Sequence, residues 1–395
     1  MPRCLAFFLQ ILYTETDMKH VLYGNGIDDD TQAIQDLLDG EESVVKLPRP
    51  EKNYLISAPL KIGGGKTLVL EKDAVIRLAD NSDCLMLKNK PDARENVALI
   101  GGIWDMNNQH QKPNPVVKKV EGDSLDIYAG NAVCEAEIFG EKTARATRFD
   151  DSVYFGFLMA FSDIKNLTVK DVTFKDPVTY GCWFGKIDGF LVENITFDYN
   201  DGNPYPVNMD GVHFHGLCRN GVIRNMKGAC YDDMIAFSAD EFIAGDIENV
   251  VVENIEAYDC HSAVRLLAVD HCVRNVAIRN IRGTFYQYCI GFTKYYAMGN
   301  GVCGRFENIL AENCEIAKAP MLKKYKKDAS HRYPLFYFQQ ETVSENVIIR
   351  NIVRKETDCA VPLIGAEDGV DLSGVKAENI EQVSFVGDVP LIGRL

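Results

Sequence analysis

Three aspartates near the middle of the chain have a spacing that suits acid–base chemistry. Asp210 lies in the phrase Asn208-Met-Asp-Gly-Val-His213, and the pair Asp232-Asp233 follows it. The offset from Asp210 to Asp232 (232 − 210) is close to one unit of a repeat in the same region. Strands stacked about 4.8 Å apart would gather these carboxylates in one patch. Carboxylates that close raise one another's pKa, so one can stay protonated as a general acid while another acts as a base toward water.

A histidine and an arginine follow at a matching distance. The offset from Asp232 to His261 (261 − 232) is again about one unit, and Arg265 follows in the same coil. An Asp-Asp pair alone is common in turns, and a lone histidine here would be an ordinary hydrogen-bonded surface residue. The shared spacing favours a site instead. We therefore predict that His261 and Arg265 lie beside the carboxylates.

The strands that would position these residues are predicted by a repeated phrase. A polar residue, alternating apolar residues and then Asn or Asp recur, as in Glu248-Asn-Val-Val-Val-Glu-Asn254. Short period-2 strands with a turn-forming Asn at one phase are typical of a parallel β-helix, an all-β solenoid whose coils pair with those above and below. We expect the Asn side chains to bond along the stack at turns with left-handed φ. The residues at this phase recur at intervals of about 30 residues, within the range of solenoid repeats: Asp171, Asn194, Asn225, Asn254, Asn280, Asn313, Asn351 and Asn379.

The repeat makes the chain one solenoid rather than several domains. Residues 1–17 are interpreted as an N-terminal extension or weak signal-like segment, and residues 18–395 as a single β-helix domain. A short helix over Ala33-Ile-Gln-Asp-Leu-Leu38, closed by Gly40, is expected to cap the first coil. The repeat is interrupted by loop excursions near 108–150 and 318–334.

Composition excludes some partners. Lys plus Arg is 42 and Asp plus Glu is 57, so the formal net charge is −15. This balance argues against a nucleic-acid or anionic-membrane partner, although an acidic substrate can still bind a local basic cleft. The twelve cysteines form no C-x-x-C pair and no zinc-type cluster, so we predict no metal and no cofactor. Scattered cysteines of this kind favour a reducing, cytoplasmic location. The sequence does not indicate an oligomeric state.

These motifs, taken in order, resemble those of the polygalacturonase family, glycoside hydrolase family 28. Asn208-Met-Asp210 is similar to the family's N-T-D phrase, Asp232-Asp233 to its D-D pair, and Cys260-His261-Ser262 to its G-H-G phrase. The resemblance covers roughly residues 21–300 and implies a single-stranded, right-handed parallel β-helix. Two earlier phrases also match, Asp29-Asp-Thr31 and Gly101-Gly-Ile-Trp-Asp-Met-Asn107.

The resemblance also implies roles for individual residues. Asp232 would be the general acid, Asp210 and Asp233 would hold and activate water, and His261 would tune the acids or contact the sugar. The family's R-I-K phrase, which grips a substrate carboxylate, is eroded here: Gly291 stands near the Arg position, and Lys294 is displaced by one residue. Arg265 could supply the lost guanidinium. This erosion indicates a substrate other than plain galacturonan. The predicted substrate-binding residues are Asn208, His213, Arg265 and Lys294.

The sequence thus predicts an inverting glycoside hydrolase that acts on a pectin-type or related oligosaccharide or polysaccharide. The long interrupting loops suggest an exo mode of action. Two alternatives stay open. A polysaccharide lyase or uronate epimerase could use the same fold, with Ca²⁺ and a basic proton abstractor. A non-catalytic carbohydrate-binding β-helix is the other alternative, although binding alone does not require clustered carboxylates.

Overall fold

A computed structural model describes residues 20–115, 119–121, 124–126, 154–295, 297–320 and 333–395. The predictions for residues 1–17 and for most of the two excursions therefore lie outside the described residues. The elements are α1 (Thr31–Asp39), β1 (Val44–Lys46), β2 (Tyr54–Ile56), β3 (Leu60–Ile62), β4 (Thr67–Val69), β5 (Val75–Leu78), β6 (Leu87–Asn89), β7 (Glu95–Ile100), β8 (Ile103–Asp105), the 3₁₀ turn η1 (Asn108–His110), β9 (Lys119–Glu121), β10 (Ser124–Asp126), β11 (Met159–Lys170), β12 (Thr173–Lys175), β13 (Cys182–Asp198), β14 (Val212–His215), β15 (Arg219–Gly228), β16 (Asp233–Ser238), β17 (Ile247–Cys260), β18 (Ser262–Leu267), β19 (Cys272–Phe285), β20 (Ile290–Thr293), β21 (Gly304–Lys318), β22 (Phe336–Phe338), β23 (Thr342–Glu356), β24 (Ile364–Ala366), β25 (Val375–Ser384) and β26 (Ile392–Arg394).

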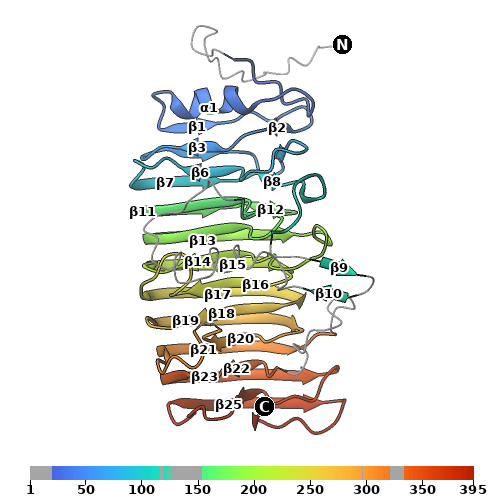
Figure 1. Ribbon diagram of the computed structural model, residues 1–395, viewed down its shortest axis with the longest axis vertical. Coiled ribbons are helices and arrows are strands. Elements are labelled where there is room, and N and C mark those ends of the chain that lie inside the picture. The colour runs from blue at the N-terminus through green and yellow to red at the C-terminus, as the bar shows by residue number, and fades with distance from the viewer. Residues whose placement is uncertain (1–19, 116–118, 122–123, 127–153, 296, 321–332) are drawn as a thin grey trace, which may run out of the picture.

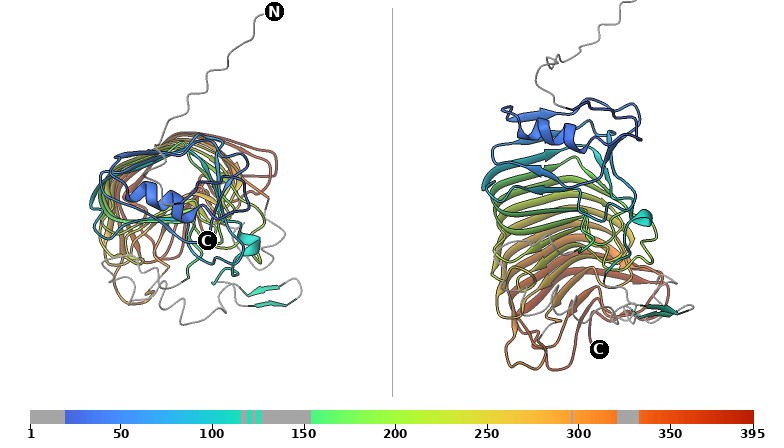
Figure 2. Two further views of the ribbon diagram at one scale, coloured as in Figure 1. Left: turned by 90° about the horizontal axis from the view of Figure 1, so that it is seen from above. Right: turned by 45° about the horizontal axis from the view of Figure 1, so that its top comes forward.

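The described strands form a parallel β-helix, as the repeat predicted. Each strand pairs in parallel with the strand one coil away, as β13 does with β15, β15 with β17 and β17 with β19. The coils lie on one another along the long axis of the molecule, from α1 at one end to β25 at the other (Figure 1). Seen along that axis, they enclose a common interior (Figure 2). Only the antiparallel hairpin of β9 and β10 lies outside this sheet among the described strands.

The interior is filled by side chains that repeat from coil to coil. A column of buried phenylalanines runs through four coils, with ring centroids 6.1 Å apart from Phe161 to Phe184, 4.6 Å from Phe184 to Phe214 and 5.6 Å from Phe214 to Phe237. Each ring is fully buried. Aromatic residues bury large apolar areas, so this column fixes which face of each strand points inward and therefore which points to solvent.

The recurrent asparagines form the expected ladder. Asn254 donates from Nδ2 to Asn225 at 2.9 Å and accepts from Asn280 at 2.9 Å, and the chain of bonds continues from Asn379 down to Asp171. All eight residues have φ between 51° and 60°. Asn tolerates this left-handed backbone better than other non-glycine residues, and its amide can both donate and accept along the stack. The predicted ladder is confirmed.

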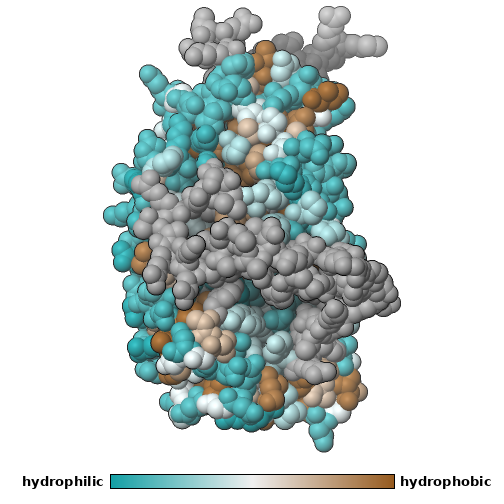
Figure 3. Space-filling view, viewed as in Figure 1, coloured by the Kyte–Doolittle hydropathy of each residue, from teal (hydrophilic) through white to brown (hydrophobic). Residues whose placement is uncertain are grey.

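The ends of the described stack differ. Helix α1 covers the first coil with Ala33, Ile34 and Leu38 buried, which confirms the predicted cap. At the other end apolar residues stay exposed, including Phe385 at 74% and Ile392 at 57%, and hydrophobic surface gathers there in Figure 3.

No described helix is both long enough and apolar enough to span a membrane. No disulfide joins the ten described cysteines.

The ladder generates a prediction about stability. Replacing Asn254 with Ala removes two ladder hydrogen bonds and places a β-carbon at a left-handed φ, so we expect a loss of about 2–3 kcal/mol in the free energy of unfolding. Asn254→Gly loses the same bonds without the backbone strain and should be less destabilised by about 1 kcal/mol. The measurement is urea unfolding followed by circular dichroism.

The exposed Glu256 on the same strand is the control, because Glu256→Ala breaks no ladder bond and should change stability by less than about 0.5 kcal/mol. Equal losses for Asn254→Ala and Glu256→Ala would contradict a stabilising ladder.

Candidate active site

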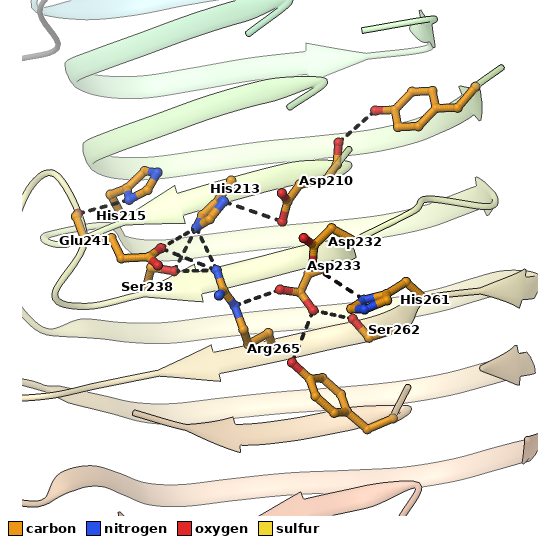
Figure 4. Close-up of polar contacts among 12 residues, drawn as sticks. Asp210, His213, His215, Asp232, Asp233, Ser238, Glu241, His261, Ser262 and Arg265 are labelled. Carbon is orange, nitrogen blue, oxygen red and sulfur yellow. Dashed lines mark hydrogen bonds and ion pairs between the residues drawn. The ribbon is translucent and has the colours of Figure 1, made fainter. Parts of the chain in front are cut away.

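Stacking brings residues from successive coils to one surface of the solenoid. Val212 pairs with Ile235, and extending this register by two places Asp210 level with Asp233. The backbone amide of Gly211 donates to the carbonyl oxygen of Asp233, in agreement with this register. The sequence spacing matched Asp210 with Asp232 instead. That match gives a coil one residue shorter than the one that the register shows. The carboxylates nevertheless gather as predicted (Figure 4).

The next coil follows the predicted spacing. Asp233 pairs with Ser262, so the residues before them, Asp232 and His261, are level with each other. His213, Ala236 and Arg265 share one rung of three neighbouring coils. Of these, the side chains of His213 and Arg265 point toward the carboxylates (Figure 4).

Asp233 is held by one ion pair and two hydrogen bonds. Its Oδ2 lies 2.7 Å from Nε of Arg265, its Oδ1 accepts from the Ser262 hydroxyl, and the Tyr288 hydroxyl lies 3.5 Å from the same oxygen. Burial raises the pKa of Tyr288 well above its usual value, so its hydroxyl stays a neutral donor. Asp233 itself is 1% exposed. A buried carboxylate with both oxygens engaged keeps a fixed orientation.

Asp210 has a different environment. It is 2% exposed, and burial raises its pKa well above the usual value, with Asp232 and Asp233 adding to the shift. Its Oδ1 lies 3.6 Å from Nδ1 of His213, beyond ordinary hydrogen-bonding distance. The raised pKa means that Asp210 keeps its proton at a pH where an exposed aspartate has lost it.

Asp232 is the most accessible of the three aspartates. Its side chain is 28% exposed, against 3% for Asp210 and 1% for Asp233. Nδ1 of His261 lies 3.4 Å from Oδ1 of Asp232, and the His261 ring packs edge-on against Tyr286. Asp232 therefore has both an imidazole beside it and a path to solvent.

Glu241 adds a fourth carboxylate that the sequence analysis missed. It lies between β16 and β17 with a fully buried side chain, and its Oε2 is 2.9 Å from Nε2 of His213 and 3.4 Å from a terminal nitrogen of Arg265. Burial alone would raise the pKa of Glu241, but Arg265 and His213 outweigh it and hold the pKa well below the usual value. Glu241 is therefore a buried anion paired with Arg265.

Aromatic rings enclose the histidine side of the site. The Tyr180 ring lies 4.5 Å from the His213 ring, and Trp183 stacks on His215 at 4.9 Å. Burial lowers the pKa of His213 and lowers that of His215 further. An apolar surrounding of this kind strengthens every charge interaction inside it.

Two groups of side chains are close enough to be considered for a metal ion. In His213, His215 and Glu241, one donor atom of each lies within 4.8 Å of the others. The two imidazoles, however, are stacked at 4.3 Å with planes 13° apart. Nitrogen lone pairs lie in the ring planes, so parallel stacked rings cannot both point at one ion. A terminal nitrogen of Arg265 also lies 3.2 Å from Nε2 of His213 and 3.4 Å from Glu241.

The second group is Asp232, Asp233 and His261, which meet the same distance limit. Here Asp233 already has both oxygens engaged by Arg265, Ser262 and Tyr288. We assign a metal to neither group.

One predicted substrate-binding residue, Lys294, does not join the cluster. The ammonium of Lys294 is 2.7 Å from Oδ1 of Asn300, 2.7 Å from the carbonyl oxygen of Val302 and 2.5 Å from Oε2 of Glu341, with its side chain fully buried. Lys294 follows the end of β20, three residues beyond Gly291, which is the residue level with Arg265. Asn208 is partly buried at a left-handed φ of 52°, two residues before Asp210.

The residues that sequence reasoning missed are Glu241, Ser238, Tyr288 and His215. His215 alternates with His213 along a strand, so its outward direction could have been inferred from the period of two. Glu241 follows a strand in a loop without periodicity, and no signal in the sequence places it against Arg265. The Ser238 hydroxyl lies 2.7 Å from Nε2 of His213.

The raised pKa of Asp210 predicts how stability depends on pH. A group whose folded pKa exceeds its unfolded value favours the folded state at low pH, and this contribution is lost as the pH rises through the folded pKa. Asp210→Asn cannot lose a proton, so the free energy of unfolding of the variant should gain on wild type as the pH rises above about 4, the pKa of an aspartate in the unfolded chain. Urea unfolding at a series of pH values measures the difference. A difference independent of pH would contradict the raised pKa.

Comparison with known proteins bears on the fold. No family model and no curated protein matches the sequence. A family 28 exopolygalacturonase from Yersinia enterocolitica superposes with a TM-score of 0.59 at 14% identity, covering 95% of this chain and 78% of its own. An endo-xylogalacturonan hydrolase from Aspergillus tubingensis gives 0.64 at 14% identity, with 94% and 93% covered, and the Streptococcus pneumoniae surface adhesin PfbA gives 0.52 at 16%, with 96% and 92% covered. The expected resemblance is confirmed at the level of the fold: this chain is a parallel β-helix similar in structure to these proteins.

Proposed function

We propose that this protein is a glycoside hydrolase that cleaves an oligosaccharide or polysaccharide by an inverting acid–base mechanism. The observation that carries the proposal is the gathering of three aspartates in three different environments. Asp232 is accessible and lies beside His261, Asp233 is fixed by Arg265 and Ser262, and Asp210 is buried with a raised pKa. Groups whose environments separate their protonation states supply the acid and the base of such a reaction.

In the proposed reaction Asp232 gives its proton to the glycosidic oxygen, and the bond from that oxygen to the anomeric carbon breaks. Asp233 takes a proton from a water molecule whose oxygen forms the new bond to the anomeric carbon. Protonated Asp210 donates a hydrogen bond to the same water and keeps the patch from carrying three negative charges. Asp233 then releases its proton to solvent and Asp232 takes one up, which restores the starting state. The fold is shared with two proteins whose names are those of glycoside hydrolases, which supports this reaction class.

The non-catalytic alternative has one observation in its favour, since a bacterial adhesin shares the same fold. Fold alone therefore does not separate the two functions. Measured turnover does separate them, because a protein that only binds carbohydrate has no catalytic acid whose substitution could abolish a reaction.

Asp232→Asn should lower kcat by about 10²- to 10⁴-fold while leaving the melting temperature nearly unchanged, since Asn keeps the size but cannot deliver a proton. Reducing-end release from a panel of neutral and uronic-acid oligosaccharides measures the rate. Asp198→Asn is the matched control, because Asp198 is an exposed aspartate paired with Lys175 and should keep wild-type turnover. Substantial turnover by Asp232→Asn would remove Asp232 as the acid, and wild-type protein inactive on the whole panel would count against hydrolysis.

The stereochemical course tests the role of Asp233. Inverting enzymes usually separate their carboxyl groups by roughly 6.5–9.5 Å and retaining enzymes by roughly 5–5.5 Å. The nearest oxygens of Asp232 and Asp233 lie within 4.8 Å, at the short end of this scale, so the product anomer is a decisive measurement. We expect inversion, because in the proposed reaction Asp233 takes a proton from water and does not itself attack carbon. Proton NMR of the first-formed product shows the anomer directly, and retention would make a carboxylate the nucleophile.

A further inference from the structure

The Tyr288 side chain lies beside the carboxylates, just before β20. It is buried, its ring stacks on Tyr337 with centroids 5.8 Å apart, and its hydroxyl lies 3.5 Å from Oδ1 of Asp233. A distance of 3.5 Å is long for a hydrogen bond between two oxygens. Contacts of this kind in unliganded sites often shorten when substrate binds. The Tyr288 hydroxyl is therefore close enough to act on Asp233.

Gly291 makes room for the Tyr288 ring. It is level with Arg265 on one neighbouring coil and with Tyr337 on the other. A β-carbon at Gly291 would lie 2.6 Å from two carbons of the Tyr288 ring, well inside the optimum of about 3.5 Å for a carbon–carbon contact. A larger residue at this rung, an arginine included, would displace the ring. The glycine where an arginine was expected is therefore what the position of Tyr288 requires.

The turn after β20 supports the Tyr288 hydroxyl. The hydroxyls of Tyr288 and Tyr295 are hydrogen-bonded to each other, and Nε2 of Gln287 lies 3.4 Å from the Tyr295 hydroxyl. Burial raises the pKa of both tyrosines above the usual value, so both hydroxyls keep their protons. A neutral hydroxyl donates to one partner and accepts from another. Tyr295 can thus fix the direction in which the Tyr288 hydroxyl points.

Tyr295 is held in a backbone conformation that a tyrosine disfavours. Its φ is 51°, in the left-handed region that bulky residues rarely adopt. Oε1 of the buried Gln339 accepts from the backbone amide of Lys294 at 2.7 Å and from that of Tyr295 at 3.0 Å. A strained backbone of this kind persists only where its surroundings impose it, and it is concentrated at functional sites. The strain at Tyr295 is therefore matched by a specific clamp.

We propose that Tyr288 is a positioning residue for Asp233, and that Gly291 and the turn at Tyr295 hold Tyr288 in place. This inference rests on the proposed function, in which Asp233 takes a proton from water. Proton transfer needs a carboxylate of fixed orientation, and a donor at Oδ1 restricts rotation of the carboxyl group. Tyr288 acts on Oδ1 together with the Ser262 hydroxyl, while Arg265 holds the other oxygen.

Two variants remove this contact in different ways. Tyr288→Phe keeps the ring and loses the hydroxyl, whereas Gly291→Ala keeps the hydroxyl and displaces the ring. We expect each to lower kcat by about tenfold and to change KM by less than about twofold, because the contact orients the base and does not bind the sugar. The rates are measured on the oligosaccharide of the panel that wild type cleaves fastest.

Tyr54→Phe is the matched control for the loss of a hydroxyl. Tyr54 is an equally buried tyrosine on β2, and its hydroxyl donates to the carbonyl oxygen of Pro48 at 2.5 Å. The variant should keep wild-type kcat and KM.

The turn is tested by Tyr295→Phe, which keeps the backbone bonds to Gln339 and loses only the hydroxyl. We expect kcat to fall by about threefold, less than for Tyr288→Phe, since Tyr295 acts through Tyr288. Combined with Tyr288→Phe, it should cause no further loss, because both hydroxyls act through one contact. Losses that multiply in the double variant would overturn the role of the turn.

Crystal structures of Tyr288→Phe and Gly291→Ala separate this inference from the proposed function. We expect the Asp233 carboxyl group to leave its wild-type plane in both. An unmoved carboxyl group in both variants, or wild-type kcat in Tyr288→Phe, overturns the positioning role and leaves hydrolysis standing. A carboxyl group that turns, in a protein that cleaves no member of the panel, supports the positioning role and contradicts hydrolysis. If Gly291→Ala does not fold, Tyr288→Phe decides the outcome by itself.

Discussion

The register between successive coils is the constraint on which the rest of this structure depends. Parallel pairing fixes each strand against its neighbours one coil away, and the buried phenylalanine column and the asparagine ladder prevent slippage from two sides of the coil. A slip of one residue would turn the core side chains outward. The same register sets which outward side chains share a rung, so the site is a consequence of coil length rather than of any local motif.

The carboxylates illustrate what that register produces. Asp210, Asp232 and Asp233 come from two coils and would be ordinary turn residues apart from each other. Brought together, they differ in exposure and in donors, so burial keeps a proton on Asp210 while Arg265 and Ser262 fix Asp233. The aromatic rings around His213 and His215 keep the local dielectric low, which enlarges these differences. The three aspartates therefore differ in their properties because their surroundings differ, although their side chains are the same.

Much of this could be predicted from the sequence because the repeat carries geometric information. The spacing from Asp232 to His261 correctly predicted that these two residues lie level, and the turn asparagines predicted the ladder. The spacing from Asp210 to Asp232 was one residue short of the real offset, since a sequence repeat shows coil length only approximately when turns vary. Glu241 and Lys294 lie just beyond the ends of strands, where the repeat no longer determines direction. Their partners became visible only with the fold.

The position of Arg265 shows how neighbouring coils of one fold can carry different outward side chains. Arg265 and Gly291 pair across β18 and β20, so they occupy the same rung of neighbouring coils. Gly291 stands near the position at which the polygalacturonase-like phrase would carry its arginine. The guanidinium is therefore shifted by one strand spacing, about 4.8 Å, toward Asp233 and Glu241. A shift of this size places the cation against two of the chain's own carboxylates, Asp233 and Glu241. In a solenoid the shift leaves core and ladder intact, because the outward side chain at a rung is not part of either. The outward charge of one coil can thus lie on a neighbouring coil while the fold stays the same.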